Sequence, residues 1–267
     1  MQDGGPQSMS IIDARASVSQ SARIGKDARI GAFSVIGDDV ELGDGCVIEP
    51  HAVINGPSRI GKNNHVRSFA AIGCDPQDIS FAGERVCLEV GDGNEFYEFV
   101  TVSRGTKKGG GTTRIGSKNM FMAYSHIAHD CLVGNHTIFV NGATLAGHVT
   151  VEDNATIGAF CTVHQFCRVG RHAYVAALTA ITQDVPPFSK VVQSRDVRCF
   201  AVNSIGLQRH GFSPERIKTI ERAFRLLLRS KLNTTQALEK MKATLNSSTD
   251  VSELIRFIET AERGLVK

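Results

Sequence analysis

Five of the nine histidines lie within one short segment of the chain: His126, His129, His136, His148 and His164. Neutral imidazole accepts a proton near pH 7, so a surface on which several histidines meet is suited to general-base chemistry. These side chains meet only if the secondary structure brings separate parts of the segment onto one surface. The repeat that organises the rest of the chain predicts such an arrangement.

A six-residue repeat runs from Val18 to Ile181 with two interruptions. Every sixth position is aliphatic or Phe, as in Ile24, Ile30 and Ile36, and the position two residues earlier is usually small. Because residues two apart share one face of a strand, both of these point inward and the residue between them points outward. Three such hexads close one triangular coil of 18 residues, which predicts a parallel β-helix.

Successive coils of a β-helix stack about 4.8 Å apart, so residues 18 positions apart lie at the same corner. One such step from His129 reaches Gly147, and a second reaches Gln165. Three more histidines lie beside this column on outward or corner positions: His126, His148 and His164. The period therefore predicts a cluster of histidines around one glycine.

Other candidate residues have simpler interpretations. His136 and His172 stand alone on corners and are expected to be solvated turn residues. The seven cysteines are odd in number and form no CxxC pair, which argues against a disulfide framework and against a zinc ribbon. Four of them occupy the small inward position and are expected to be buried hydrophobes: Cys46, Cys131, Cys161 and Cys167.

The chain is expected to divide into three parts: a disordered leader at 1–10, a β-helix at 11–190 and a helical C-terminal domain at 191–267. Two loops interrupt the repeat, at 73–89 and 103–114. Long loops on a rigid scaffold commonly carry function.

Helical signals follow the last repeat. Ser213, Pro214 and Glu215 supply an N-cap, a proline at the first helical position and an early acid. Apolar residues then follow at helical spacing, and further helices are expected near 235–245 and 251–262.

The composition excludes several classes of protein. Lys and Arg total 30 against 27 Asp and Glu, so a general nucleic-acid-binding surface is not expected. No stretch approaches about 18 consecutive apolar residues, so no transmembrane segment is expected. The first ten residues lack the features of a secretory signal, and Met9 is an alternative start. A cytoplasmic location is expected.

Several motifs together resemble the UDP-N-acetylglucosamine O-acyltransferases, hexapeptide-repeat transferases that catalyse the first step of lipid A synthesis. The similarity extends over essentially the whole chain after Met9, including the helical tail. It implies that the β-helix is left-handed. A homotrimer is expected, because a site on one open edge of a solenoid needs the edge of a neighbouring copy to exclude water. The motifs are Ser125–Asp130, Leu145–His148, His164–Cys167, Gln77-Asp78, Gln183–Pro187 and the stretch from Asn203 to Phe212.

The resemblance also implies a mechanism. His129 would remove the proton from the 3-hydroxyl of UDP-N-acetylglucosamine, and that oxygen would attack the thioester of a 3-hydroxyacyl chain on acyl carrier protein. Asp130 would hold and polarise His129, which requires a corner because adjacent strand residues point apart. The backbone N–H of Gly147 would stabilise the oxyanion. No cofactor, metal ion or covalent enzyme intermediate is needed.

The remaining site residues are carried over from the same resemblance. Ala177 is small at the position that measures the acyl chain, which permits a medium-to-long chain without fixing its length. Three positions of the substrate-contact set depart from the family pattern, whereas the general base and the oxyanion site match it: Ser80 replaces a Lys, Ile205 a Glu and His210 an Arg. The residues implied in substrate binding are Asp78, His126, His148, His164, Gln165, Asn203 and Arg209.

Three alternatives remain open. A carbonic anhydrase-like enzyme of the γ class would use His126, His129 and His148 as zinc ligands, which metal analysis would detect. An N-acyltransferase would take an amino-sugar nucleotide, such as the 3-amino analogue of UDP-N-acetylglucosamine, as a panel of UDP-sugars would show. A β-helix scaffold without activity would have no reason to gather histidines on one edge.

Overall fold

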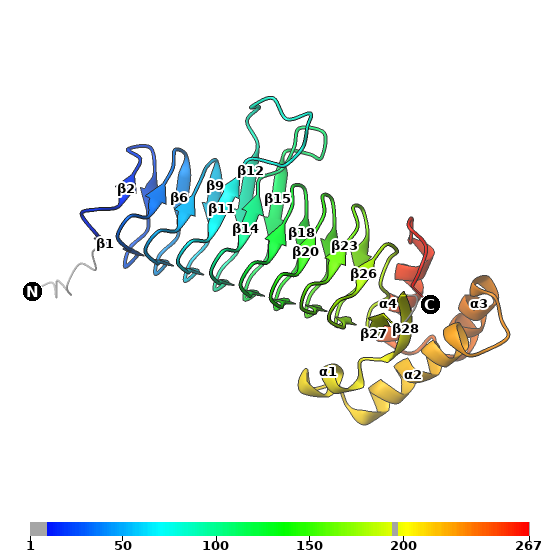
Figure 1. Cartoon of the computed structure of the whole chain (residues 1–267). Coiled ribbons are helices and arrows are strands. Elements are labelled where there is room, and N and C mark those ends of the chain that lie inside the picture. The colour runs from blue at the N-terminus through cyan, green and yellow to red at the C-terminus, as the bar shows by residue number, and fades with distance from the viewer. Residues whose placement is uncertain (1–9, 194–196, 267) are drawn as a thin grey trace, which may run out of the picture.

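The computed structural model describes residues 10–193 and 197–266; the predicted leader at 1–10 therefore lies, apart from Ser10, outside the described residues. The chain forms a left-handed parallel β-helix of triangular coils that is followed by four α-helices, as the repeat and the resemblance together predict (Figure 1). Short strands from successive coils pair in parallel and build three sheets along the long axis, here called sheets A, B and C.

The strands of each sheet follow one another coil by coil. Sheet A consists of β1 (Ile11–Ile12), β4 (Arg29–Ile30), β7 (Val47–Ile48), β10 (His65–Val66), β13 (Glu95–Phe96), β16 (Met120–Phe121), β19 (Ile138–Phe139), β22 (Thr156–Ile157), β25 (Tyr174–Val175), β27 (Ser189–Gln193) and β28 (Val197–Val202). Sheet B consists of β2 (Ser17–Val18), β5 (Val35–Ile36), β8 (Val53–Ile54), β11 (Ala71–Cys74), β14 (Thr101–Ser103), β17 (His126–Ile127), β20 (Thr144–Leu145), β23 (Thr162–Val163) and β26 (Ala180–Ile181). Sheet C consists of β3 (Arg23–Ile24), β6 (Val40–Leu42), β9 (Ser58–Ile60), β12 (Cys87–Val90), β15 (Thr112–Ile115), β18 (Leu132–Val133), β21 (Thr150–Val151) and β24 (Arg168–Val169).

The core of the solenoid is the set of positions that the hexads predict to point inward. In the site region, Ile127 pairs with Leu145 in the next coil and Leu145 pairs with Val163, and all three are buried. Stacking like side chains coil over coil removes apolar surface from water and fixes the 18-residue register. The four cysteines expected to be buried are buried: Cys46, Cys131, Cys161 and Cys167.

Both predicted loops are shorter than the sequence indicated. The first irregular segment spans 75–86, because β11 and β12 continue into the predicted range of 73–89. The second spans 104–111 rather than 103–114, because β14 ends at Ser103 and β15 begins at Thr112. Figure 1 shows the loop region projecting from the middle of the solenoid beside β12.

The C-terminal part caps the last coils. The predicted boundary at 190 falls inside β27, which pairs in parallel with β25 and antiparallel with β28. Helix α4 lies on the last coils, since the guanidinium of Arg168 donates to the carbonyl of Phe257 at 3.1 Å. No helix in the described residues is long and apolar enough to span a membrane. The helices are α1 (Ser204–Arg209), α2 (Pro214–Leu228), α3 (Thr234–Thr244) and α4 (Thr249–Glu259).

The helical signals in the sequence correspond to three of these four helices. The Ser213 hydroxyl accepts from the Arg216 N–H and Pro214 occupies the first turn, so the predicted start of α2 is confirmed. Helices α3 and α4 begin one or two residues before the predicted 235–245 and 251–262. Helix α1 was not predicted, because a segment of six residues is too short to show a period.

Candidate active site

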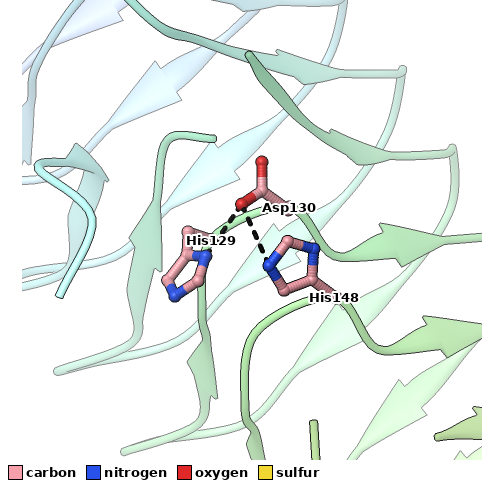
Figure 2. A group of neighbouring side chains, drawn as sticks. All are labelled: His129, Asp130 and His148. Atoms are coloured by element: carbon pink, nitrogen blue, oxygen red, sulfur yellow. Dashed lines mark hydrogen bonds and ion pairs between the residues drawn. The ribbon is translucent and has the colours of Figure 1, made fainter. Parts of the chain in front are cut away.

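An aspartate–histidine pair forms the centre of the site (Figure 2). The Nδ1 atom of His129 lies 2.8 Å from Oδ2 of Asp130, within hydrogen-bond distance. The Asp130 side chain is almost fully buried, whereas 13% of the His129 side chain is exposed. An Nδ1–H that donates to Asp130 leaves Nε2 as the acceptor nitrogen of a neutral imidazole. The pair therefore presents a proton acceptor at the surface.

A corner of the coil lets these adjacent residues face each other. Asp130 has φ of 61°, in the left-handed region, whereas consecutive residues of a strand point to opposite faces. The Asp130 N–H donates to the hydroxyl of Thr113 at 2.8 Å, which fixes the turn. The corner geometry that the predicted role of Asp130 requires is thus present.

The short loop at 104–111 holds the carboxylate from the other side. Thr106 donates its backbone N–H to Oδ1 of Asp130 at 2.8 Å and its hydroxyl to Oδ2 at 2.7 Å. A Cβ on Gly109 would lie 2.1–2.3 Å from the atoms of the Asp130 carboxyl group, so only glycine fits at that position. Charge-assisted bonds from a buried partner fix the carboxylate, and with it the orientation of the imidazole.

Gly147 lies directly against the imidazole, one coil beyond His129. A Cβ at Gly147 would be 2.5 Å from Cε1 and 2.9 Å from Nε2 of His129. The predicted juxtaposition of His129 and Gly147 is therefore present, and the missing side chain makes room for the ring. In the described part of the chain, the Gly147 N–H donates to no protein oxygen, so it is available to a ligand.

His148 completes a group around the same carboxylate. Its Nε2 lies 3.7 Å from Oδ2 of Asp130, and its ring meets that of His129 edge-on at 5.3 Å. Phe166, one coil further, stacks on the His148 ring at 4.5 Å. Figure 2 shows the Asp130 carboxylate between the two imidazoles.

His126 lies nearby but has a different partner. Its Nδ1 is 2.7 Å from the hydroxyl of Thr101 on the preceding coil. Burial lowers the pKa of His126 below its usual value, and the neighbouring His129 lowers it further. A neutral imidazole on the open face of sheet B is suited to hydrogen-bond a substrate.

Asp78 comes from the first loop, close enough for His129 and Lys108 to act on its charge. Its Oδ1 accepts from both the N–H and the hydroxyl of Ser80, each at 2.7 Å. These bonds, with the charges of His129 and Lys108, lower the pKa of the Asp78 carboxyl group, which is an anion at neutral pH. Ser80, which stands where the family pattern has a lysine, therefore orients the carboxylate of Asp78, one of the predicted substrate-binding residues.

Other predicted residues lie on the open surface without partners in the cluster. His164 and Gln165 are exposed, and Nδ1 of His164 lies 3.2 Å from the carbonyl oxygen of Gln165. Ala177 is also exposed, at the end of the coil above Gly158. Their roles in substrate binding and chain length remain predictions.

Asn203 and Arg209 lie at a different corner from His129. Asn203 caps α1 by accepting from Gly206 N–H, and its amide donates to the carbonyl of His172. Arg209 is exposed in the last turn of α1. A single chain therefore does not bring the predicted nucleotide-binding residues to the base.

His172 was expected to be a solvated turn residue, and this prediction is wrong, because the side chain is buried. The ring of His210 packs edge-on against it at 4.8 Å, and that of Phe212 at 5.0 Å. Burial, together with the nearby charge of Arg171, lowers the pKa of His172 to about 4. The segment after β28 covers this corner, which the repeat alone does not predict.

Sequence reasoning missed Thr106, Thr113 and Gly109, all three of which act on Asp130. The sequence carries one usable signal for them. The glycine-rich loop at 104–111 interrupts the hexads in the coil that precedes Asp130, so it emerges beside the same corner. A loop inserted beside a cluster of polar side chains is a candidate for positioning those side chains.

Comparison with known proteins identifies similar sequences and structures. The family described as UDP N-acetylglucosamine O-acyltransferase, domain 2, matches residues 184–266, and bacterial transferase hexapeptide repeats match 21–56, 39–74 and 112–147. The acyl-[acyl-carrier-protein]–UDP-N-acetylglucosamine O-acyltransferase of Xylella fastidiosa is 46% identical over 97% of this chain and 98% of its own length. The enzyme of the same name from Halorhodospira halophila is 49% identical over 97% of this chain and 100% of its own.

Solved structures agree with the sequence comparisons. The UDP-N-acetylglucosamine acyltransferase of Bacteroides fragilis superposes with a TM-score of 0.94 and 37% identity, over 96% of this chain and 100% of that one. The enzyme of Francisella novicida gives a TM-score of 0.93 and 37% identity, over 96% and 94% of the two chains. The similarity thus covers the solenoid and the helical part together.

Proposed function

The chain belongs to the UDP-N-acetylglucosamine O-acyltransferase family, and from this membership and the geometry of the site we propose its reaction. The protein transfers a 3-hydroxyacyl chain from acyl carrier protein to the 3-hydroxyl of UDP-N-acetylglucosamine, the first step of lipid A synthesis. The hydrogen bond between His129 and Asp130 is the observation that carries the mechanism. A cytoplasmic location remains a prediction.

The chain's own groups account for each proton and charge. His129 Nε2 accepts the proton of the sugar 3-hydroxyl as that oxygen attacks the thioester carbonyl carbon. The N–H of Gly147 stabilises the oxyanion of the tetrahedral intermediate. When the carbon–sulfur bond breaks, the imidazolium of His129 returns its proton to the departing thiolate of acyl carrier protein. Asp130 stabilises the imidazolium between these two transfers.

The active form is a homotrimer, and one support for this is an aromatic ridge along the corner between sheets A and B. Rings from Phe33 to Tyr124 stack coil over coil with centroids 4.9–5.4 Å apart. A long apolar ridge on the surface of a single chain is typical of a protein contact. The exposed members are Phe33, His51, Phe69, Phe99, Tyr124, Phe160 and Leu178.

The second support is the separation of Asn203 and Arg209 from His129. If three copies meet along the ridge, sheet B of one copy faces sheet A of the next. His129 lies at the far edge of sheet B, and His172, which holds Asn203, lies at the far edge of sheet A. The neighbour's Asn203 and Arg209 then face His129 across the interface, where the nucleotide is expected.

Negative charges introduced on the aromatic ridge are expected to dissociate the trimer. Phe69→Glu combined with Phe99→Glu places like charges where apolar rings stack, so we expect monomers with little activity. Sedimentation velocity measures the assembly. Leu132→Glu is the matched control, because Leu132 is an equally exposed apolar residue on sheet C, away from the ridge. A wild-type protein that is fully active as a monomer would contradict the trimer.

The acceptor sugar is tested by competition. Ser80 and Ile205 replace a cation and an anion of the family pattern, and Ile205 is 65% exposed on α1. These replacements leave an N-acyltransferase acting on the 3-amino analogue as the second candidate. We expect UDP-N-acetylglucosamine to outcompete that analogue when both are supplied with one 3-hydroxyacyl carrier protein. An amide as the main product would favour the second candidate.

A further inference from the structure

We propose that His129, Asp130 and His148 also form a binding site for one divalent transition-metal ion, with Zn²⁺ as the best match, and that the bound ion switches the base off. The site is assigned from the three residues that converge there, with Nδ1 of His129 and Nε2 of His148 both facing Oδ2 of Asp130. The inhibitory half of the proposal rests on the proposed function, whereas the binding half does not.

The spacing of the three atoms suits a single ion. One ligand atom from each of the three residues lies within 4.8 Å of the other two. Ligands about 2.1 Å from a tetrahedral Zn²⁺ ion lie roughly 3.4 Å from each other. The two distances to Oδ2 of Asp130, 2.8 Å from His129 and 3.7 Å from His148, lie on either side of that value. Shifts of less than about 1 Å therefore complete three corners of a tetrahedron, with the fourth left for water.

Neighbouring side chains also fix the orientation of the proposed ligands, and these contacts can persist when an ion binds. Thr106 donates two hydrogen bonds to the Asp130 carboxylate, and Phe166 stacks on the His148 ring. Outer partners of this kind orient metal ligands and raise affinity. Two imidazoles and one carboxylate form a donor set that Zn²⁺ accepts readily. His126 is not part of this group, because its Nδ1 faces Thr101.

A bound ion would disable His129 as a base by changing the protonation of its second ring nitrogen, Nε2. The ion takes the position of the proton on His129 Nδ1, and that proton transfers through solvent to Nε2. A neutral imidazole that binds metal through Nδ1 carries its single proton on Nε2. The nitrogen that accepts the substrate proton then becomes a donor. The ion therefore disables the base, and it also occupies Nε2 of His148, one of the residues expected to bind the substrate.

Zn²⁺ binding can be measured on the full chain without substrates, by competition with a chromophoric chelator. We expect one ion per chain. His148→Gln should weaken binding by about 100-fold or more, the upper end of what loss of an outer partner alone produces. His136→Gln, which changes an exposed histidine at another corner, should bind as the wild type does. Equal affinity of the wild type and His148→Gln would overturn the site.

The inhibitory step needs a second measurement, on the wild-type enzyme only. Turnover should fall in proportion to Zn²⁺ occupancy and recover fully when EDTA is added. Full turnover at full occupancy would overturn the switch. Failure of the proposed reaction is recognised separately, because the acyl-transfer assay with EDTA present contains no bound ion.

Discussion

Replacing His129 with alanine is expected to lower kcat by about 10²–10⁴-fold, the usual range for loss of a general base. The change removes an imidazole that is hydrogen-bonded to Asp130 and placed against Gly147. The rate of acyl transfer under saturating substrates measures the effect.

The fold should survive this substitution, because His129 lies on a corner and the inward positions around it are filled by Ile127 and Cys131. Circular dichroism and sedimentation of the variant control for loss of structure. His136→Ala is a matched control, since it removes an exposed histidine from another corner. Retention of more than about a tenth of wild-type activity would assign the base elsewhere, and His148 would be the next candidate.

Asp130→Asn is expected to lower kcat by about 10²-fold, the low end of the range for loss of a general base, because the base is present but in the wrong tautomer. The backbone N–H of Thr106 is a fixed donor to Oδ1, so the amide oxygen should take that position. The amide NH₂ then faces Nδ1 of His129, which must accept a hydrogen bond. The remaining ring proton moves to Nε2, where it blocks proton abstraction.

The KM values separate this explanation from a general loss of structure. We expect both KM values to change little, because Asp130 is buried and does not reach the substrates. A rate equal to that of the wild type would show that Asp130 does not set the tautomer of His129.

The sequence predicts the solenoid and the histidine cluster for the same physical reason. A side chain that stacks every 18 residues fixes both the core, as in Ile127 and Leu145, and the corner that joins His129 to Gly147. The contact between Asp130 and its neighbour His129 needs a corner at this position, and the positive φ of Asp130 shows that a corner is present.

Parts of the chain without a period could not be placed in this way. Thr106 lies in an insertion, so its contact with Asp130 depends on the course of a loop. Strands β27 and β28 extend sheet A without a hexad, which explains why the predicted boundary at 190 falls within a strand. His172 is buried because His210 and Phe212, which follow α1 in the chain, pack against its ring. No repeat encodes this tertiary contact.

The mass and chemistry of the product test the central claim most directly. UDP-N-acetylglucosamine would be incubated with 3-hydroxyacyl carrier proteins of increasing chain length, using the wild type and His129→Ala. We predict a singly acylated nucleotide sugar that mild alkali cleaves, as expected of an ester on the 3-oxygen, from the wild type and almost none from the variant. The preferred chain length would at the same time test the role of Ala177. An alkali-stable amide, no acylated nucleotide sugar, or equal product from both proteins would contradict the account.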